Sequence, residues 1–289
     1  MMPDKKLYIS SKHEQDLWFP AIPPGRTRYF AHAFETYAVE GRILFNSANE
    51  DPWVFSIHGA RADFTKSDAV SFGLQQKNYS ILSMNMSGHS KASPRKPEET
   101  ILGDNVLEVE TFYDYLNKRK KKIVIAYSLG GTPALNLLKN HASDIDKLVL
   151  FYPGIYTKAA YTKHFGKEFK DTVSEPFSYR QNDTISLLKS FKGELLLVKG
   201  EYDGLDPELY NKPAGGSAGE VIIDKKSYYS PIPKEVIDLV YHAVPNTRRK
   251  LIEIPQCGHS VVLWMREHQS EAEIFLNQID RFLKRTTRT

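Results

Sequence analysis

A serine stands where a strand-like segment passes directly into a helix-like one. The sequence IVIAYSLGGTPALNLL runs from apolar, β-branched residues through Ser128 into an amphipathic stretch. A turn this sharp exposes the serine hydroxyl and leaves little room beside it, so the residues two positions before and after must be small. They are Ala126 and Gly130. The pattern is typical of a serine that attacks a carbonyl carbon, and an ordinary helix cap is the alternative role.

Strand-like segments alternate with amphipathic segments along the chain, which predicts a mostly parallel central sheet flanked by helices. Two upstream segments, 28–34 and 36–45, alternate apolar and polar residues and should form an antiparallel lead-in. Apolar residues at helical spacing predict core-facing helices around 106–116 and 274–283. The six main strand candidates are residues 53–57, 80–84, 123–127, 147–152, 195–199 and 250–254.

Two stretches interrupt this alternation. Residues 153–183 are rich in aromatic side chains, and residues 207–233 contain four prolines and three glycines. We therefore predict one core domain made of residues 1–152 and 184–289, with 153–183 as a lid or cap insertion and 207–233 as a second loop insertion. Surface decoration is the alternative for the second stretch. Tyr152, Phe165 and Phe169 are the candidate contacts for an apolar substrate.

With these elements in place, the sequence resembles the α/β-hydrolase superfamily from about Tyr37 to Leu283. Besides the turn at Ser128, the resemblance rests on the segments SIHGA, SMNMSGHSKAS, LLLVKGEYDGLDP and PQCGHSV. The first is similar to the superfamily's oxyanion loop. The second resembles its D-x-x-G-x-G-x-S turn, with Asn85 in place of the aspartate and His89 where glycine is commoner. The resemblance implies the α/β-hydrolase fold.

The resemblance also supplies two partners for Ser128, namely Asp203 from the third segment and His259 from the fourth, in the chain order of this superfamily. All three residues follow expected strands, and the carboxyl ends of parallel strands share one rim where ligands bind. The implied roles are attack by Ser128, proton transfer by His259 and orientation of the imidazole by Asp203. The backbone N–H groups of Leu129 and Ala60 would form the oxyanion hole.

Several assignments have alternatives. Asp203 could be a turn residue, with Asp206 or Glu201 as the acid. His259 could be a structural histidine at a strand end. Cys257 is the single cysteine, so an internal disulfide is excluded, and we expect it to be a small packed residue.

The composition excludes several classes of protein. The 289 residues include 39 basic and 35 acidic side chains, a net charge of +4, which excludes a disordered acidic chain. The longest uncharged stretch, residues 123–138, falls short of the roughly 20 apolar residues that span a bilayer. The basic runs lack interleaved aromatics, so we expect no nucleic-acid partner. The N-terminus shows no secretory apolar core, which makes the cytoplasm the default location.

These observations predict a serine hydrolase that uses a Ser-His-Asp triad and an acyl-enzyme. Its small-molecule substrate should be an ester or thioester of a medium-sized, largely apolar or aromatic acyl compound. The same triad could instead support C–C bond hydrolysis, acyl transfer or a lyase reaction, and a low-turnover ligand-binding module is a second alternative. No metal-ligand spacing or phosphate-binding loop occurs, so we expect no metal and no cofactor. No oligomeric state follows from the sequence.

Overall fold

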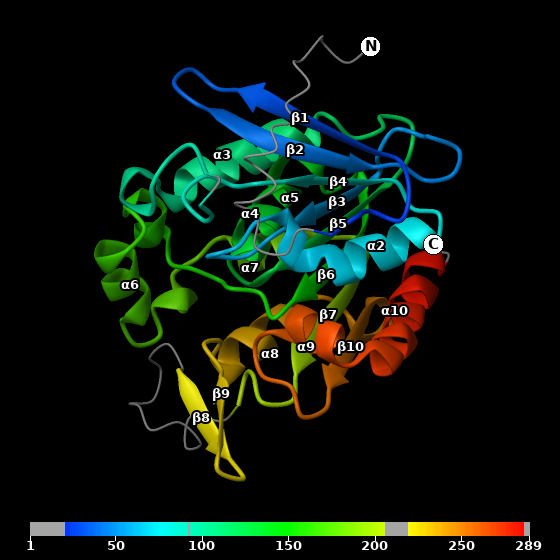
Figure 1. Cartoon of the computed structure of the whole chain (residues 1–289). Coiled ribbons are helices and arrows are strands. Elements are labelled where there is room, and N and C mark those ends of the chain that lie inside the picture. Colours follow the sequence, from blue (N-terminus) through cyan, green and yellow to red (C-terminus); the bar gives the residue numbers. More distant parts are fainter. Residues whose placement is uncertain (1–20, 92, 206–218, 286–289) are drawn as a thin grey trace.

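An eight-stranded sheet forms the centre of the molecule, in the order β1-β2-β4-β3-β5-β6-β7-β10 (Figure 1). The computed structural model describes residues 21–91, 93–205 and 219–285. β1 is antiparallel to β2 and β2 to β4, and the remaining neighbours are parallel. The strands are β1 (Thr27–Ala33), β2 (Ala38–Leu44), β3 (Val54–Ile57), β4 (Ile81–Met84), β5 (Lys122–Tyr127), β6 (Ile145–Phe151), β7 (Glu194–Gly200) and β10 (Arg249–Ile254).

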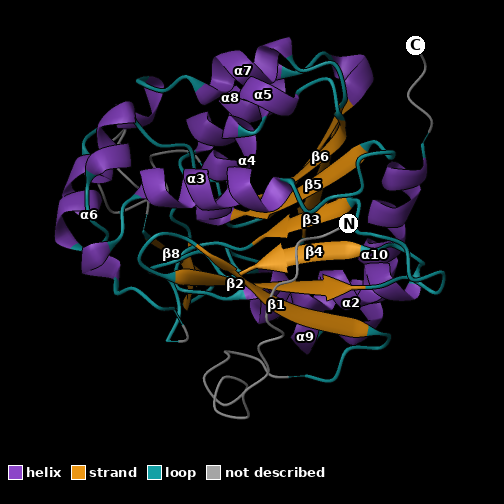
Figure 2. Ribbon diagram, turned by 90° about the horizontal axis from the view of Figure 1, so that it is seen from above, coloured by secondary structure: helices purple, strands orange, loops and turns teal. Residues whose placement is uncertain are grey.

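Helices cover both faces of the sheet (Figure 2). On one face, α2 (Asp68–Gln76), α9 (Val261–Glu267) and α10 (Gln269–Lys284) contact one another. The other face carries α3 (Leu102–Tyr113), α4 (Gly131–Asn136), α5 (Leu138–His141), α7 (Thr184–Ser190) and α8 (Lys234–Ala243). The expected sheet, its antiparallel lead-in and both expected helices are confirmed, each strand within two residues of its expected bounds.

The alternation of side chains along each strand explains why both faces need helices. In β5, Ile123, Ile125 and Tyr127 pack into the cluster that contains α2, α9 and α10 residues. Val124 and Ala126 point the other way, into the cluster of the α3, α4, α7 and α8 face. A strand that is apolar on both sides must be covered on both sides, so the continuous apolar runs of the sequence fix the three-layer arrangement.

The two stretches that interrupt the alternation take different forms. Residues 153–183 contain the 3-10 helices η4 (Lys158–Thr162) and η5 (Ser178–Arg180), with α6 (Lys167–Ser174) between them. This stretch is attached to the chain before α3, because the Phe165 N–H donates to the Thr100 carbonyl at 3.0 Å. Of residues 207–233, the part up to 218 lies outside the described residues. The remainder includes an antiparallel hairpin of β8 (Glu220–Ile223) and β9 (Lys226–Tyr229).

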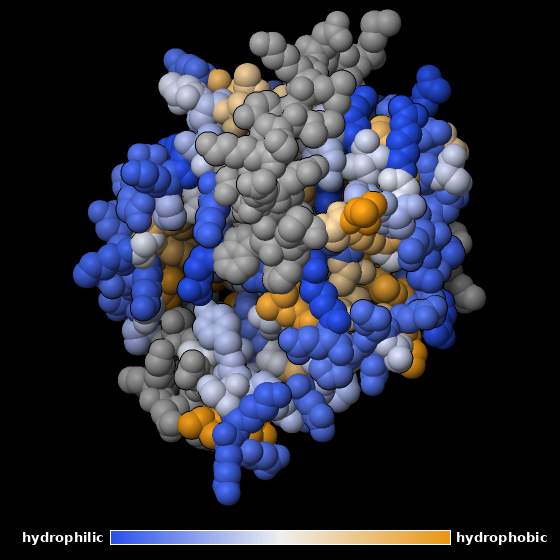
Figure 3. All heavy atoms as spheres, viewed as in Figure 1, coloured by the Kyte–Doolittle hydropathy of each residue, from blue (hydrophilic) through white to orange (hydrophobic). Residues whose placement is uncertain are grey.

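Hydrophilic side chains predominate on the described part of the face seen in Figure 3, and apolar residues gather near its middle and over the β8–β9 hairpin. Ile222 of that hairpin is 66% exposed. None of the helices in the described ranges combines the length and the apolar character needed to cross a bilayer.

Candidate active site

The turn between β5 and α4 brings Ser128 into a tight backbone conformation. Ser128 has a φ of 50°, in the left-handed region that only a minority of non-glycine residues adopt. The turn also packs closely against the segment after β3, since a Cβ on Gly130 would lie 2.4 Å from the His58 carbonyl oxygen. A Cβ on Gly59 would lie 3.0 Å from the Ser128 Cβ. Only glycine fits at position 130, which explains the small residue that the sequence has there.

His259 lies between Ser128 and Asp203 and contacts both. Its Nε2 is 2.9 Å from the Ser128 Oγ, and its Nδ1 is 2.6 Å from the Asp203 Oδ2. A carboxylate can only accept a hydrogen bond, so Nδ1 carries the ring proton and Nε2 is free to accept the serine proton. Asp203 is fully buried and His259 is 8% exposed. In this arrangement, His259 Nε2 can therefore accept the proton of the Ser128 hydroxyl.

Asp203 is held in place by the chain that follows β9. Its second carboxylate oxygen, Oδ1, lies 3.3 Å from the Ser230 hydroxyl and 3.4 Å from the Ile232 N–H, both of which donate to it. The same segment supports the histidine, whose backbone N–H donates to the Tyr229 carbonyl at 2.9 Å. These contacts orient both side chains before any substrate binds.

Lys199, at the end of β7, fixes the turn that carries Asp203. Its Nζ donates to the backbone carbonyls of Asp203 at 3.1 Å and Gly200 at 3.3 Å. The same ammonium pairs with the Glu253 carboxylate on β10 at 2.7 Å. A buried lysine needs such partners, and here they join the ends of two neighbouring strands beneath the acid.

A cavity of about 280 Å³ opens beside the serine and the histidine. Ala60 lies in its wall, whereas Leu129 follows Ser128 inside the turn and its side chain is buried. The described residues that line it are His58, Gly59, Ala60, Arg61, Ala62, Lys66, Ser67, Tyr127, Ser128, Tyr152, Tyr229, His259, Ser260 and Val262.

Aromatic rings flank the imidazole in this cavity. The Tyr152 ring lies 4.4 Å from the His259 ring between centroids, and the Tyr229 ring lies 5.6 Å away, edge-on. Burial raises the pKa of Tyr152, so its phenol is neutral. Tyr152, one of the expected substrate contacts, thus lines the cavity beside Ser128.

Phe165 and Phe169 are not among the described residues that line this cavity. Phe165 packs against His89 with ring centroids 4.6 Å apart, and Phe169 packs against Phe165 and Tyr156. Phe165 is buried in this cluster, which attaches residues 153–183 to the core. Packing against the core therefore explains why that stretch is rich in aromatic residues. Composition alone cannot distinguish such packing from contact with a substrate.

The segments after β3 and β4 are joined by two buried histidines. His58 donates from Nδ1 to the Gly59 carbonyl at 2.7 Å and accepts the Met86 N–H on Nε2 at 2.9 Å. His89 contacts the Asn105 Oδ1 of α3 through Nε2 at 2.8 Å. Burial lowers the pKa of His58 to about 4 and that of His89 to about 3. Both rings are neutral at physiological pH.

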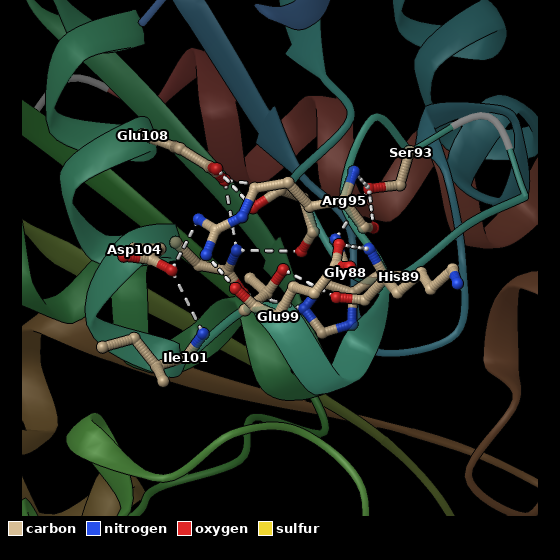
Figure 4. A network of polar contacts seen from close by, with 12 residues as sticks. Gly88, His89, Ser93, Arg95, Glu99, Ile101, Asp104 and Glu108 are labelled. Carbon is tan, nitrogen blue, oxygen red and sulfur yellow. Dashed lines mark hydrogen bonds and ion pairs between the residues drawn. The ribbon is translucent and has the colours of Figure 1, made fainter. Parts of the chain in front are cut away.

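Further polar contacts hold the segment after β4 against α3 (Figure 4). Glu108 accepts the Ser87 N–H at 3.0 Å, and Asn105 donates to the same carboxylate at 3.1 Å. Nearby, the Arg95 guanidinium pairs with Asp104 at 2.8 Å and donates to the Glu99 carbonyl. This network fixes the segment that faces His58, and through it the wall of the cavity.

The single cysteine, Cys257, is buried. Burial raises the pKa of the Cys257 thiol to about 12, so the sulfur is protonated near neutral pH and is a poor nucleophile. Among the residues that the structure describes, no group of three or more His, Cys, Asp or Glu side chains is placed to hold a metal ion.

Several residues of this site could not be identified from the sequence. Tyr229 ends β9 and Ser230 directly follows it within the second insertion, and no local pattern marks them as partners of His259 and Asp203. Arg61 and Lys66 line the cavity directly after the oxyanion-loop segment. The sequence offered one indication of Arg61 and Lys66, because both basic residues lie within eight positions of the oxyanion-loop segment.

Comparisons with known proteins find a partial family match and a shared fold. Residues 48–188, just under half of the chain, match the family model "Serine aminopeptidase, S33", a hydrolase family. Among curated proteins, no sequence matches significantly. The thioesterase domain from the curacin biosynthetic pathway superposes with a TM-score of 0.56 at 13% identity, covering 86% of this chain and 100% of that one. The chain has the α/β-hydrolase fold, and its family match is to a family of hydrolases.

Two further solved structures share the fold of this α/β-hydrolase. An esterase of Pyrococcus furiosus has a TM-score of 0.54 at 18% identity and covers 96% of this chain and 98% of its own. Est1E from Butyrivibrio proteoclasticus, solved with ferulic acid, has a TM-score of 0.57 at 16% identity and covers 84% and 98%. At these identities the likeness concerns the fold.

The two buried histidines predict that the α/β-hydrolase loses stability in acid. At a pH between the pKa of the histidine in the folded chain and its pKa in the unfolded chain, the buried histidine takes up a proton only when the chain unfolds. The free energy of unfolding therefore falls as the pH decreases below about 6.5. Each histidine should contribute a loss of about 2 kcal/mol between about pH 7 and pH 5. We expect His89→Gln, which keeps an N–H donor for Asn105, to remove about that much of the loss. Urea unfolding of both proteins at the two pH values measures it, and identical losses would contradict the assignment.

Proposed function

We propose that this α/β-hydrolase is a serine hydrolase that cleaves an ester or thioester through Ser128, His259 and Asp203. The observation that carries the proposal is the continuous contact from the Ser128 Oγ through the His259 ring to the buried Asp203 carboxylate. The Ser128 Oγ lies 2.9 Å from His259 Nε2, and both residues line an open cavity. A histidine with a purely structural role would not require this arrangement.

The first step forms an acyl-enzyme. The Ser128 oxygen attacks the carbonyl carbon of the substrate while His259 Nε2 takes the hydroxyl proton. Asp203 stabilises the imidazolium through its hydrogen bond to Nδ1. When the tetrahedral intermediate collapses, Nε2 returns the proton to the departing alcohol or thiol. A water molecule then repeats the sequence, releasing the carboxylic acid and restoring Ser128.

The negative charge on the intermediate requires donors beside Ser128. We propose the backbone N–H groups of Leu129 and Ala60 for this role. Leu129 directly follows the nucleophile, and Ala60 lies in the cavity wall in the segment packed against the Ser128 turn. Donors placed in this way typically contribute about 3 to 4 kcal/mol each to transition-state stabilisation.

The cavity supports a compact acyl or aryl group. Its volume of about 280 Å³ lies near the lower end of the range of small-molecule sites, roughly 300 to 1,000 Å³. We propose Tyr152 and Tyr229 as the aromatic contacts of the substrate. We further propose that residues 153–183 form a cap over this site, since their first turn is joined to the nucleophile by the Gly154 N–H, which donates to the Ser128 carbonyl at 2.7 Å. Phe165 and Phe169 would then support the cap from within.

We expect Ser128→Ala to lower kcat for aryl acetates by at least about 10⁴-fold, because it removes the attacking oxygen. The change removes one oxygen atom, so the urea unfolding curve should shift little. Steady-state hydrolysis with and without the substitution measures this. Ser186→Ala, at an exposed position on α7, serves as the control and should match the wild type. Wild-type activity in Ser128→Ala would contradict the mechanism.

The identity of the acid is tested separately. Asp203→Asn should lower kcat by about 10⁴-fold, because the amide stabilises the wrong imidazole tautomer. Glu201→Gln should stay near wild type, since the Glu201 carboxylate accepts the Gln256 N–H in a neighbouring turn. Asp206, the other alternative, lies outside the described residues, and we expect little loss in Asp206→Asn. Activity retained in Asp203→Asn but lost in Asp206→Asn would reassign the acid and leave the serine and histidine roles intact.

A further inference from the structure

Two cations stand in the wall of the cavity beside the proposed nucleophile. Arg61 and Lys66 are both among the described residues that line it, and no carboxylate is among them. His58 also lies in this wall, but it adds little positive charge, because burial lowers the pKa of its imidazole to about 4. The formal charge that this wall presents to a substrate is therefore positive.

Arg61 and Lys66 lie close enough for their positive charges to repel each other. Burial and then the charge of Arg61 lower the pKa of Lys66, and the charge of Lys66 in turn contributes to the lowered pKa of His58. Lys66 is half-buried, so its ammonium is partly removed from water. Like charges held together in a partly buried site repel each other, and an anion bound between them relieves that repulsion.

Asp63 is a carboxylate whose charge acts against this repulsion, and it lies in the protein interior. Asp63 is fully buried, and its Oδ1 accepts the Thr65 N–H at 2.9 Å as well as the Thr65 hydroxyl. Its charge raises the pKa of Lys66, but it does so less than burial and Arg61 lower it. Asp63 thus offsets part of the charge of Lys66 and is not among the described residues of the cavity wall.

The backbone also presents Arg61 in an unusual conformation. Its φ is 49°, in the left-handed region, although it is not glycine. Conformations of this kind cost roughly 1 to 3 kcal/mol and persist where the surrounding structure enforces them, often at ligand sites. This turn directly follows Gly59 and Ala60, which pack beside Ser128, so the exposed guanidinium is carried by the same short segment as the proposed oxyanion donor.

We propose that Arg61 and Lys66 form an anion subsite and that the substrate is an ester or thioester carrying a carboxylate or phosphate group. This inference rests on the proposed function for its reaction and deepens it by naming the substrate class. Arg61 offers a planar pair of donors that suits an oxyanion, and Lys66 adds a second positive charge in the same cavity wall. The anion would lie in either the acyl part or the leaving group.

Matched ester pairs test the proposal and show which part carries the anion. For the leaving group, the pair is 4-acetoxybenzoate and 4-acetoxybenzamide. For the acyl part, it is the monophenyl ester of terephthalic acid and its monoamide counterpart. We expect kcat/KM to be higher for the acid than for the amide by about tenfold or more in one pair, the effect of a hydrogen bond to a charged group. Added salt should reduce this ratio.

Substitutions connect the preference to the two side chains. The acid-to-amide ratio should fall toward one in Arg61→Gln and in Lys66→Met, and most of it should return in Arg61→Lys, which restores the charge. Lys189→Gln, an exposed cation on α7 outside the cavity wall, should leave the ratio at the wild-type value. A ratio near one in both pairs for the wild type, or a preference that survives both substitutions, would overturn the proposal.

Binding without turnover separates this proposal from the proposed function. Calorimetry on Ser128→Ala with 4-hydroxybenzoate and 4-hydroxybenzamide measures the anion subsite alone. We expect the acid to bind about tenfold or more tightly than the amide, and the difference to disappear in Ser128→Ala/Arg61→Gln. If neither ester of either pair is hydrolysed by the wild type, the proposed reaction fails, and this titration still decides the subsite. Equal binding of acid and amide would refute the subsite even in an active hydrolase.

Discussion

The close approach of two turns at the end of the sheet is the constraint on which the rest of the site depends. Gly130 lies so near the His58 carbonyl that a Cβ would be 2.4 Å from its oxygen, and Gly59 lies against the Ser128 side chain. β3 and β5 are neighbours and parallel, with Ile57 opposite Ala126 in register, so both turns leave the sheet at the same edge. This places the serine and its proposed oxyanion donors at one edge of the sheet, where Arg61 and Lys66 also line the cavity.

The remaining two residues of the proposed triad depend on a segment far from them in sequence. Ser230 and Ile232 donate to Asp203, and the Tyr229 carbonyl accepts the His259 N–H. A carboxylate buried at this depth needs such donors, because an unpaired buried charge is strongly unfavourable. The β8–β9 hairpin is therefore part of the catalytic architecture proposed here, whereas the sequence also allowed it to be surface decoration.

The parts of this molecule that follow local rules could be predicted from the sequence. β3, β4, β5, β6 and β7 are mainly apolar runs that are buried on both faces, and Ser128 sits between a strand and a helix with small residues around it. The parts set by distant contacts could not. Nothing near Ser230 indicates a bond to a residue 27 positions earlier, and the aromatic residues 165 and 169 pack on His89 and Tyr156 rather than in the cavity wall. In the sequence, Arg61 and Lys66 cannot be distinguished from ordinary surface charges, whereas in the fold they line the same cavity as Ser128.

The proposed mechanism requires that the Ser128 oxygen is an activated nucleophile, and covalent labelling can show whether it is. A fluorophosphonate reacts with a serine whose proton is withdrawn by a neighbouring histidine, and peptide mass spectrometry then locates the adduct. The account predicts a single adduct on Ser128 in the folded protein, formed together with loss of esterase activity, and no adduct in His259→Ala over the same time. An adduct elsewhere that accompanies the loss of activity, or an unlabelled Ser128 in an active enzyme, would contradict it.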